Sequence, residues 1–304
     1  MKETQLKILM FAFDFTYKTI DLPFRVRNYA IRKIKNISLF TRENNRSDSQ
    51  TAFYEKAIKR IVSNENQQRR FRRIYNYREV LEHLDYRDGI RYLERIKSLR
   101  PETVRIISEF RTNDCFGKPR RFLYPKIGKF SPTSLRYICI ATDLYSRFNM
   151  HAIEKITEIG AGYGGQISVL NAMDIHNKNK YLVFDLPDVQ ILIQKYLSNI
   201  NLKSVSFLSI ENVNSISSDL VISNFAFSEL PQDLQMTYLE KVLLFSKNGY
   251  LLMNSGASNS TGRSTGKLTL EYLKTRIPHL EVYPENPLTG PDNYLIVWHE
   301  STIK

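Results

Sequence analysis

Glu158-Ile159-Gly160-Ala161-Gly162-Tyr163-Gly164-Gly165 is the stretch that decides the fold of this chain. An apolar run, Lys155 to Ile159, precedes it, and a helical pattern follows it. A strand that ends in a glycine-rich turn and opens a helix brings bare backbone close to a nucleotide-like ligand. Glycine suits such a turn because a Cβ would block the approach and because some positions require a positive φ. The stretch therefore predicts a nucleoside cofactor.

Two classes of cofactor fit this spacing. The glycines also satisfy the dinucleotide fingerprint, and Asp185 lies 20 residues after Gly165, where a ribose-binding acid belongs. A nicotinamide or flavin enzyme is therefore one interpretation. Glu158 favours S-adenosylmethionine, because a carboxylate there would repel a pyrophosphate but attract an ammonium and a sulfonium. The mid-chain position of the motif favours the same cofactor, and a glycine-rich turn without a ligand is the remaining alternative.

The pattern around the turn predicts strands that alternate with helices. Such alternation favours a doubly wound parallel sheet. The last two strands are joined by a proline-rich segment and look like an antiparallel addition at one edge, which is typical of class I methyltransferases rather than dehydrogenases. The expected strands are Lys155–Ile159, Tyr181–Asp185, Val205–Leu208, Leu220–Ser223, Tyr250–Asn254, Val282–Tyr283 and Tyr294–Trp298. The expected helices are Pro132 to about Phe148 with Ser131 as N-cap, Gly165–Ile175, Asp188–Asn199, Pro231–Ser246 and Leu268–Arg276.

Composition is that of a globular protein. The chain has 304 residues, of which 42% are apolar and 25% charged, enough for one large domain with an appendage. The two cysteines, Cys115 and Cys139, lack metal spacing and indicate no disulfide framework, so the sequence predicts no metal site and a reducing, cytoplasmic location. No segment approaches the roughly 20 apolar residues of a membrane span.

Charge is concentrated in the first half of the chain. Residues 1–150 hold 32 Lys and Arg against 16 Asp and Glu, whereas residues 151–304 hold 12 against 15. The basic half is either a solvated helical surface or a site for an anionic partner: a phosphate group, an acidic membrane surface at the inner face, or nucleic acid. Helical patterns cover Phe24–Ile37 and Ala52–Leu99, with a polar linker at Thr41–Thr51. We therefore expect a basic helical region at 1–110 and a second domain at 111–304.

Several motifs lie between residues 113 and 291. They are Asn113-Asp114-x-x-Gly117-x-Pro119, Ser131-Pro132-Thr133-x-Leu135-Arg136-Tyr137, the Glu158 to Ile167 stretch, Asp185-Leu186-Pro187, Ser223 to Leu230, and Asn286 to Pro291. Together these motifs resemble the bacterial sugar O-methyltransferase family. The resemblance covers roughly residues 110–299 and implies a Rossmann-like class I sheet, S-adenosylmethionine as cofactor, and methyl transfer to a sugar or glycan hydroxyl in polysaccharide biosynthesis.

Roles follow from this resemblance and from the rule that open α/β sheets bind ligands beyond the carboxyl ends of their strands. Asp185 is expected to accept the ribose hydroxyls. The predicted catalytic residues are Asn224 and Glu229, with Glu229 as general base or, alternatively, as a helix cap. The predicted cofactor-binding residues are Glu158, Gly160, Ala161, Gly162, Tyr163, Gly164, Asp185, Leu186 and Ser223. The predicted substrate-binding residues are Asn286, Thr289 and Asn293, with a tight turn as their alternative role.

Three other functions stay open at this point. The basic half of the chain could serve a nucleic-acid methyltransferase. The dinucleotide spacing leaves a nicotinamide-dependent enzyme on nucleotide sugars. A non-catalytic nucleic-acid or membrane adaptor with a vestigial fold is the third. The sequence makes no prediction of oligomeric state.

Overall fold

The computed structural model describes residues 52–173, 180–202, 204–254 and 267–300. All described residues belong to one compact unit, Arg46–Lys304. The expected boundary at residue 110 falls inside that unit. The predicted helix Phe24–Ile37 and linker Thr41–Thr51 lie outside the described residues.

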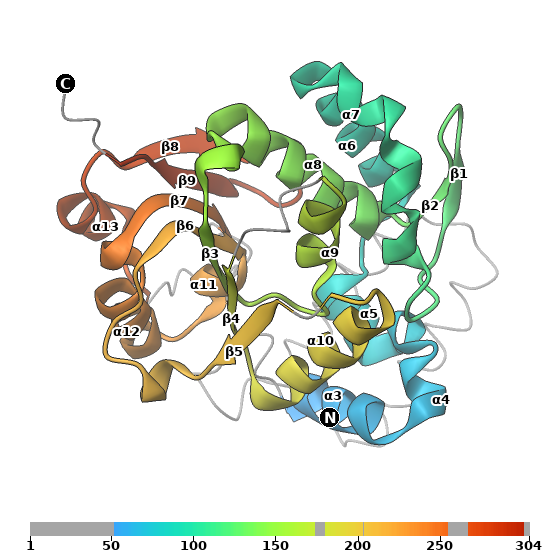
Figure 1. The fold of residues 1–304 in the computed structure, drawn as a ribbon, viewed down its shortest axis with the longest axis horizontal. Coiled ribbons are helices and arrows are strands. Elements are labelled where there is room, and N and C mark those ends of the chain that lie inside the picture. Colours follow the sequence, from blue (N-terminus) through green and yellow to red (C-terminus); the bar gives the residue numbers. More distant parts are fainter. Residues whose placement is uncertain (1–51, 174–179, 203, 255–266, 301–304) are drawn as a thin grey trace, which may run out of the picture. The chain divides into compact units, whose positions relative to one another are not determined.

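A seven-stranded sheet forms the centre of the described unit (Figure 1). Its strand order is β5-β4-β3-β6-β7-β9-β8, and every neighbouring pair is parallel except the two pairs that contain β9. This arrangement confirms the predicted Rossmann-like, mostly parallel sheet with an antiparallel addition at one edge. The final pair lies at one edge as expected, but the antiparallel strand is the inner one, β9, and β8 is the edge strand. The strands are β3 (Lys155–Ile159), β4 (Lys180–Phe184), β5 (Val205–Leu208), β6 (Ser218–Asn224), β7 (Ser246–Met253), β8 (Glu281–Pro284) and β9 (Tyr294–Trp298).

Helices cover both faces of the sheet (Figure 1). α8 (Pro132–Arg147), α9 (Gly165–Ala172) and α10 (Pro187–Asn199) lie on one face, and α12 (Gln232–Lys241) and α13 (Leu270–Arg276) lie on the other. Strands buried on both faces read as continuous apolar runs. Each face of the sheet has its own core: the first lies under α8, α9 and α10, and the second under α12 and α13. In β7, Tyr250 and Leu252 belong to the first core, while Leu251 and Met253 belong to the second. The short 3-10 turns around these elements are η4 (Met150–Ala152), η5 (Ile210–Asn212) and η6 (Leu243–Phe245).

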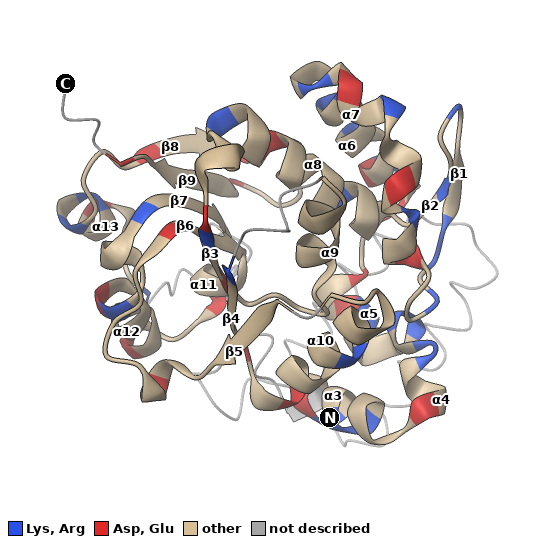
Figure 2. Cartoon of the chain, viewed as in Figure 1, with Lys and Arg blue, Asp and Glu red and all other residues tan. Residues whose placement is uncertain are grey.

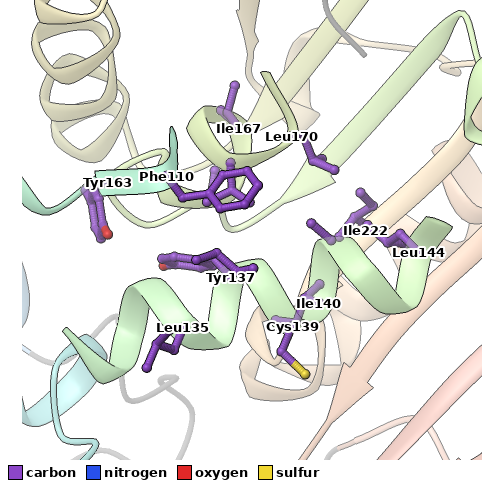
Figure 3. Packing of buried hydrophobic residues seen from close by; sticks show 14 of the residues in the cluster. Phe110, Leu135, Tyr137, Cys139, Ile140, Leu144, Tyr163, Ile167, Leu170 and Ile222 are labelled. Atoms are coloured by element: carbon purple, nitrogen blue, oxygen red, sulfur yellow. The ribbon is translucent and has the colours of Figure 1, made fainter. Parts of the chain in front are cut away.

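The first core lies between α8, α9 and the sheet. Figure 3 shows Tyr137, Ile140 and Leu144 of α8 on the side that faces α9 and the strand residue Ile222. Each of these side chains is almost fully buried, and burial of a large apolar side chain contributes about 1.5–3 kcal/mol. Ser131 is the N-cap of α8 and accepts a hydrogen bond from the backbone N–H of Ser134 at 3.1 Å, as predicted.

A layer of short helices precedes this domain in sequence and packs against it. α3 contacts α10, α6 contacts α8, and Lys195 of α10 donates to the Val62 carbonyl of α3 at 2.8 Å. The elements of this layer are α3 (Ala52–Ser63), α4 (Glu65–Gln68), η2 (Phe71–Arg73), α5 (Tyr75–Leu81), α6 (Tyr86–Leu99), α7 (Pro101–Arg105) and η3 (Ile107–Asp114). Residues 52–114 therefore share the first core with the sheet.

Arg72 ties the helical layer to the start of α8. Its side chain is fully buried and forms ion pairs with Glu82 and, at 3.4 Å, with Asp114. It also donates to the Asn113 carbonyl at 2.8 Å and to the Ser131 hydroxyl at 3.0 Å. Asp114 in turn accepts from the Ser131 backbone N–H at 2.6 Å. The network therefore joins two of the sequence motifs, the Asn113-Asp114 segment and the Ser131-Pro132 start of α8, through hydrogen bonds.

The structure contains elements that the sequence did not predict, among them a hairpin and a short helix. A hairpin of β1 (Phe122–Tyr124) and β2 (Gly128–Phe130) precedes α8, and its strands are too short to give an alternating pattern. The short helix α11 (Ala226–Glu229) directly follows β6. The expected helix over Pro231–Ser246 is also shorter in the structure: α12 ends at Lys241, and Ser246 already belongs to β7.

Candidate functional site

The glycine-rich turn connects the carboxyl end of β3 to α9, as the sequence predicted. Gly160, Gly162 and Gly164 have φ values of 75°, 61° and 88°, in the left-handed region that favours glycine. The backbone N–H of Gly160 donates to the Phe184 carbonyl at 2.8 Å, which holds the turn against the end of β4. The turn therefore lies at the edge of the sheet where open α/β folds bind ligands.

Gly160 and Gly165 also allow neighbouring helices of the chain to pack closely against the turn. A Cβ on Gly160 would overlap the methyl group of Ala226 at the start of α11. A Cβ on Gly165 would overlap the ring of Tyr137 on α8. Close packing of α8 and α11 is thus a second reason for glycine here, beside the close approach of a ligand.

Asp185 follows β4 directly and lies beside the turn. Its Oδ2 accepts the backbone N–H of Gly162 at 3.2 Å, and its Oδ1 accepts the N–H of Leu186 at 2.8 Å. Burial raises the pKa of Asp185 from 3.8 to about 7, although the N–H groups of Leu186, Gly162 and Ala161 lower it. Each carboxylate oxygen has a second lone pair, so loop capping leaves acceptor capacity for a ribose.

Glu158 is buried on β3, two residues before the first glycine. Its Oε2 accepts the hydroxyl of Tyr181 at 2.7 Å, and its Oε1 lies 3.5 Å from the side-chain nitrogen of Asn224. Burial raises the pKa of Glu158 from 4.5 to about 8; the Tyr181 hydrogen bond lowers it and the charge of Asp185 raises it further. Two carboxyl groups with raised pKa values therefore flank the glycine turn, a pattern that marks candidate functional sites.

The neighbouring strand β6 brings Ser223 and Asn224 to the same edge. The Ser223 hydroxyl donates to the Ile159 carbonyl and accepts from the Phe227 N–H, both at 3.0 Å, so it links β6, β3 and α11. Its predicted contact with a cofactor stays a prediction. The buried Oδ1 of Asn224 has no hydrogen-bond partner within the part of the chain that the structure describes. An unpaired buried acceptor beside Glu158 fits a ligand that donates hydrogen bonds.

A strained turn carries the chain from Asn224 to Glu229. Phe225 has a φ of 73°, which is rare for a residue with a side chain and concentrates at functional sites. α11 then ends at Glu229, whose half-buried carboxylate accepts from the side chain of Asn254 at 3.2 Å. Asn254 directly follows β7, so Glu229 lies at the same carboxyl edge. Its role as general base stays a prediction.

The helical layer contributes side chains that lie over this edge. Burial raises the pKa of Tyr54 on α3 well above its ordinary value, and the charges of Asp185, Tyr137 and Glu229 raise it further. Tyr54 is therefore close to both predicted ribose-binding and predicted catalytic carboxylates. Leu81 of α5 would contact a Cβ on Gly162 at 3.3 Å. Tyr54 and Leu81 carry no local signal of this position, because they belong to ordinary amphipathic helices.

Three other residues predicted to bind the cofactor, Ala161, Tyr163 and Leu186, make contacts with the protein's own core. Tyr163 is fully buried in the helical layer: its hydroxyl donates to Asn113 at 3.3 Å, and the Arg72 guanidinium lies 4.5 Å from its ring centroid. The buried Ala161 faces the site through its backbone, and the half-buried Leu186 packs against the first core. Contacts of these residues with a cofactor stay predictions.

The predicted substrate loop follows β8 and is held by Glu285. The Glu285 carboxylate accepts from the backbone N–H and hydroxyl of Thr289, at 2.7 and 2.6 Å, and from the side chain of Asn293 at 3.1 Å. Thr289 and Asn293 thus hold the loop together, which agrees with the tight turn considered as their alternative role. Asn286 lies instead on a cavity of about 320 Å³. Substrate contacts of all three residues stay predictions.

The described residues hold no group of three or more His, Cys, Asp or Glu arranged to bind a metal ion. Among the described helices, none is long and apolar enough to cross a membrane.

Comparison with known proteins gives structural likenesses only. No protein family and no curated protein matches the chain. Similar solved structures include PKMT2 from Rickettsia typhi in complex with AdoHcy, at 20% identity and a TM-score of 0.30, over 34% of this chain and 21% of that one. The CurJ carbon methyltransferase is 14% identical with a TM-score of 0.36, over 54% and 52% of the two chains. Human N-acetylserotonin methyltransferase in complex with SAM is 10% identical with a TM-score of 0.36, over 55% and 56%.

This chain therefore spans less than two thirds of each of these three proteins. The strand order, with β9 antiparallel between β7 and β8, defines the fold independently of these likenesses.

Proposed function

We propose that this protein is an S-adenosylmethionine-dependent O-methyltransferase that acts on a hydroxyl of a sugar or glycan. The observation that carries the proposal is the pair of carboxyl groups on either side of the glycine turn, the buried Glu158 and the half-buried Asp185, whose pKa values are both raised. A dinucleotide would bring a pyrophosphate to this turn. Glu158 would repel that group, whereas it attracts an ammonium.

The residues at the turn fit S-adenosylmethionine by their donor and acceptor chemistry. Glu158 and the unpaired Oδ1 of Asn224 offer acceptors to an ammonium group. Asp185 retains acceptor capacity for two ribose hydroxyls beside its bonds to Gly162 and Leu186. When bound, S-adenosylmethionine supplies a methyl group on a positively charged sulfur.

The chemistry asked of the protein is positioning and proton removal. Asn224 and the α11 turn lie at the end of β6. Glu229 would accept the proton of the substrate hydroxyl while the oxygen of that hydroxyl takes the methyl group. Orientation of the two reactants is the larger contribution, and a general base adds about 10²–10⁴-fold. Burial by Tyr54 and its layer would exclude water from the reacting atoms.

The sugar acceptor rests on the resemblance of several motifs to bacterial sugar O-methyltransferases. A nucleic-acid acceptor is the second candidate, since Lys and Arg are numerous on the helical layer and the β1–β2 hairpin (Figure 2). Part of that positive charge is internal, however: Arg72 and Arg136 are buried. We therefore favour the sugar. A cytoplasmic location, with peripheral contact at the inner membrane face, is part of the same proposal, and Cys115 and Cys139 are unpaired as a reducing compartment requires.

A transfer assay tests the proposal. The purified protein is incubated with S-adenosylmethionine carrying a trideuterated methyl group and with separate panels of sugars, sugar phosphates, glycolipids and RNA. Mass spectrometry of the sugar panels should find a trideuterated methyl ether, which forms about 10²–10⁴-fold more slowly with Glu229→Gln. If RNA is labelled and no sugar is, the acceptor is a nucleic acid and the sugar assignment is wrong.

A further inference from the structure

A cavity of about 320 Å³ lies between the helical layer, α8 and the last strands of the sheet. Its volume is at the lower end of the range for small-molecule sites. Polar side chains reach it from α6, from α8 and from the loop after β8. They are Tyr92, Arg95, Arg136, Asp143, Arg147 and Asn286.

The cavity adjoins the place where methyl transfer would occur. Leu252 of β7 lines it and is the register partner of Asn224 on β6. The Leu252 carbonyl also accepts the backbone N–H of Phe225 at 2.9 Å. Leu295 of β9, the register partner of Leu252 on the other side, lines the cavity too. A molecule in this cavity would therefore begin one strand away from Asn224, at the carboxyl edge of the sheet.

The carboxylates that line the cavity are already engaged. Asp143 pairs with Arg147 at 2.9 Å and with Arg95 at 3.5 Å, and it accepts the hydroxyl of Tyr250 at 3.1 Å. Glu285 is held by the Thr289 and Asn293 hydrogen bonds of its own loop. Three guanidinium groups therefore face two carboxylates.

Arg95 and Arg147 each form an ion pair with Asp143, whereas Arg136 forms none with the described residues. It is only 7% exposed, and no carboxylate among the described residues lies within 4.0 Å of its guanidinium. Burial lowers the pKa of Arg136, but the charges of Tyr137, Tyr92 and Glu82 and a side-chain hydrogen bond to Tyr137 raise it above its ordinary value. The centroid of the Tyr137 ring lies 5.6 Å from the guanidinium carbon. A buried guanidinium that forms no ion pair is costly, so an anionic ligand would be favourable here.

Three buried donors around the cavity lack partners within the described ranges. They are the Nε of Arg136, the Nε of Arg95 and the hydroxyl of Tyr92. Unsatisfied buried donors are rare in folded proteins, and each one calls for an explanation. Three such donors on one cavity, beside a guanidinium that forms no ion pair, have the chemistry of a site for an oxyanion, which arginine binds through parallel N–H groups.

We propose that this cavity binds an oxyanion, a phosphate monoester or a carboxylate, carried by the molecule that accepts the methyl group. Arg136 is the main contact, and Tyr92 and Arg95 donate additional hydrogen bonds. The binding of the anion stands independently, while its assignment to the acceptor rests on the proposed methyl transfer. The substrate class then narrows from sugars in general to anionic sugars.

Binding measured without cofactor tests the site separately from the methyl-transfer function. Isothermal titration at constant ionic strength compares a hexose phosphate, a hexuronate and the neutral hexose on the full chain. At least one anionic sugar should bind, and the neutral hexose should bind at least about tenfold more weakly, because hydrogen bonds to charged groups contribute about 1.5–3 kcal/mol. Binding of the phosphate alone identifies a phosphate monoester, and binding of the uronate alone identifies a carboxylate.

Three variants sharpen the test. Arg136→Met should lose anion binding by about tenfold to a hundredfold without lowering the melting temperature, since the guanidinium has no carboxylate partner to abandon. Tyr92→Phe removes one hydroxyl, so it should lower the affinity for the anion and leave the fold intact. Arg105→Met changes an exposed arginine of α7 outside the cavity and should bind the anion like the wild type.

Equal anion affinity of Arg136→Met and the wild type would overturn the proposal. So would equal binding of the neutral hexose, or no binding of either anionic sugar. Should Arg136→Met unfold, Tyr92→Phe decides: unchanged anion affinity in that variant then contradicts the site. S-adenosylhomocysteine binding to the same variants shows whether any loss is confined to the anion.

Discussion

Raising the pH should tighten the binding of S-adenosylhomocysteine, because Glu158 has to be ionised to attract the ammonium of the ligand. Burial raises the pKa of this carboxyl group to about 8. The ionised fraction then grows from about 1% at pH 6 to about 50% at pH 8. The association constant should therefore rise about fiftyfold over this range, which corresponds to about 2.3 kcal/mol. Asp185, with a pKa of about 7, adds to the rise in the lower half of the range.

Isothermal titration from pH 6 to 8 measures this rise directly. Glu158→Gln is the matched variant, because the amide keeps an acceptor for the Tyr181 hydroxyl but does not titrate. Its affinity should be lower at pH 8 and should rise less steeply, with only the share of Asp185 remaining. A wild-type affinity that is the same at pH 6 and pH 8 would refute the reasoning, as would an equally steep rise in Glu158→Gln.

The unliganded protein should show the opposite dependence. The folded-state pKa of Glu158 is raised from 4.5 to about 8, so the folded chain keeps a proton that the unfolded chain releases. The stability from this group is fully present below about pH 4.5 and is lost as the pH rises through about 8. Urea unfolding should find Glu158→Gln less sensitive to pH than the wild type between these values, and an unchanged pH profile would contradict the raised pKa.

Further substitutions test single steps of the account. Asp185→Ala should abolish binding of S-adenosylhomocysteine in a calorimeter, and retained binding would remove its role at the ribose. Glu229→Gln should leave that binding unchanged and lower kcat by about 10²–10⁴-fold; wild-type turnover would exclude it as the base. Gly160→Ala should lower the unfolding free energy by at least about 1–3 kcal/mol from its φ alone, and adding Ala226→Gly should recover the part due to overlap; no recovery would contradict that packing. Arg72→Met should cost about 3–5 kcal/mol in urea unfolding, and a loss below about 1 kcal/mol would show that the buried network is dispensable.

The parallel sheet could be predicted because local signals agreed with each other. The glycine turn fixed the end of β3 and the start of α9, and proline at the start of α8 and α10 marked two further helices. The inner position of β9 could not be predicted, since it depends on how a strand from the far end of the chain inserts beside β7. Short elements such as α11 and the β1–β2 hairpin carry too few residues for a period to show.

The candidate site could be predicted only where strands end. Glu158, Asp185 and Asn224 follow directly from strand positions, and the structure brings their side chains to one edge. The contribution of Tyr54 depends on the packing of α3 over that edge, which no local pattern encodes. The lack of an ion pair at Arg136 among the described residues is likewise a tertiary property, because the sequence does not show which carboxylates are already engaged.

The central claim is that the glycine turn holds S-adenosylmethionine. Thermal unfolding of the purified protein with S-adenosylhomocysteine, and separately with NAD and NADP, tests it most directly. At about 100 times its dissociation constant a ligand stabilises by about 2.7 kcal/mol, which should raise the melting temperature by roughly 2–4 °C in a domain of this size. The account predicts this rise with S-adenosylhomocysteine alone. A rise only with a nicotinamide cofactor would contradict it.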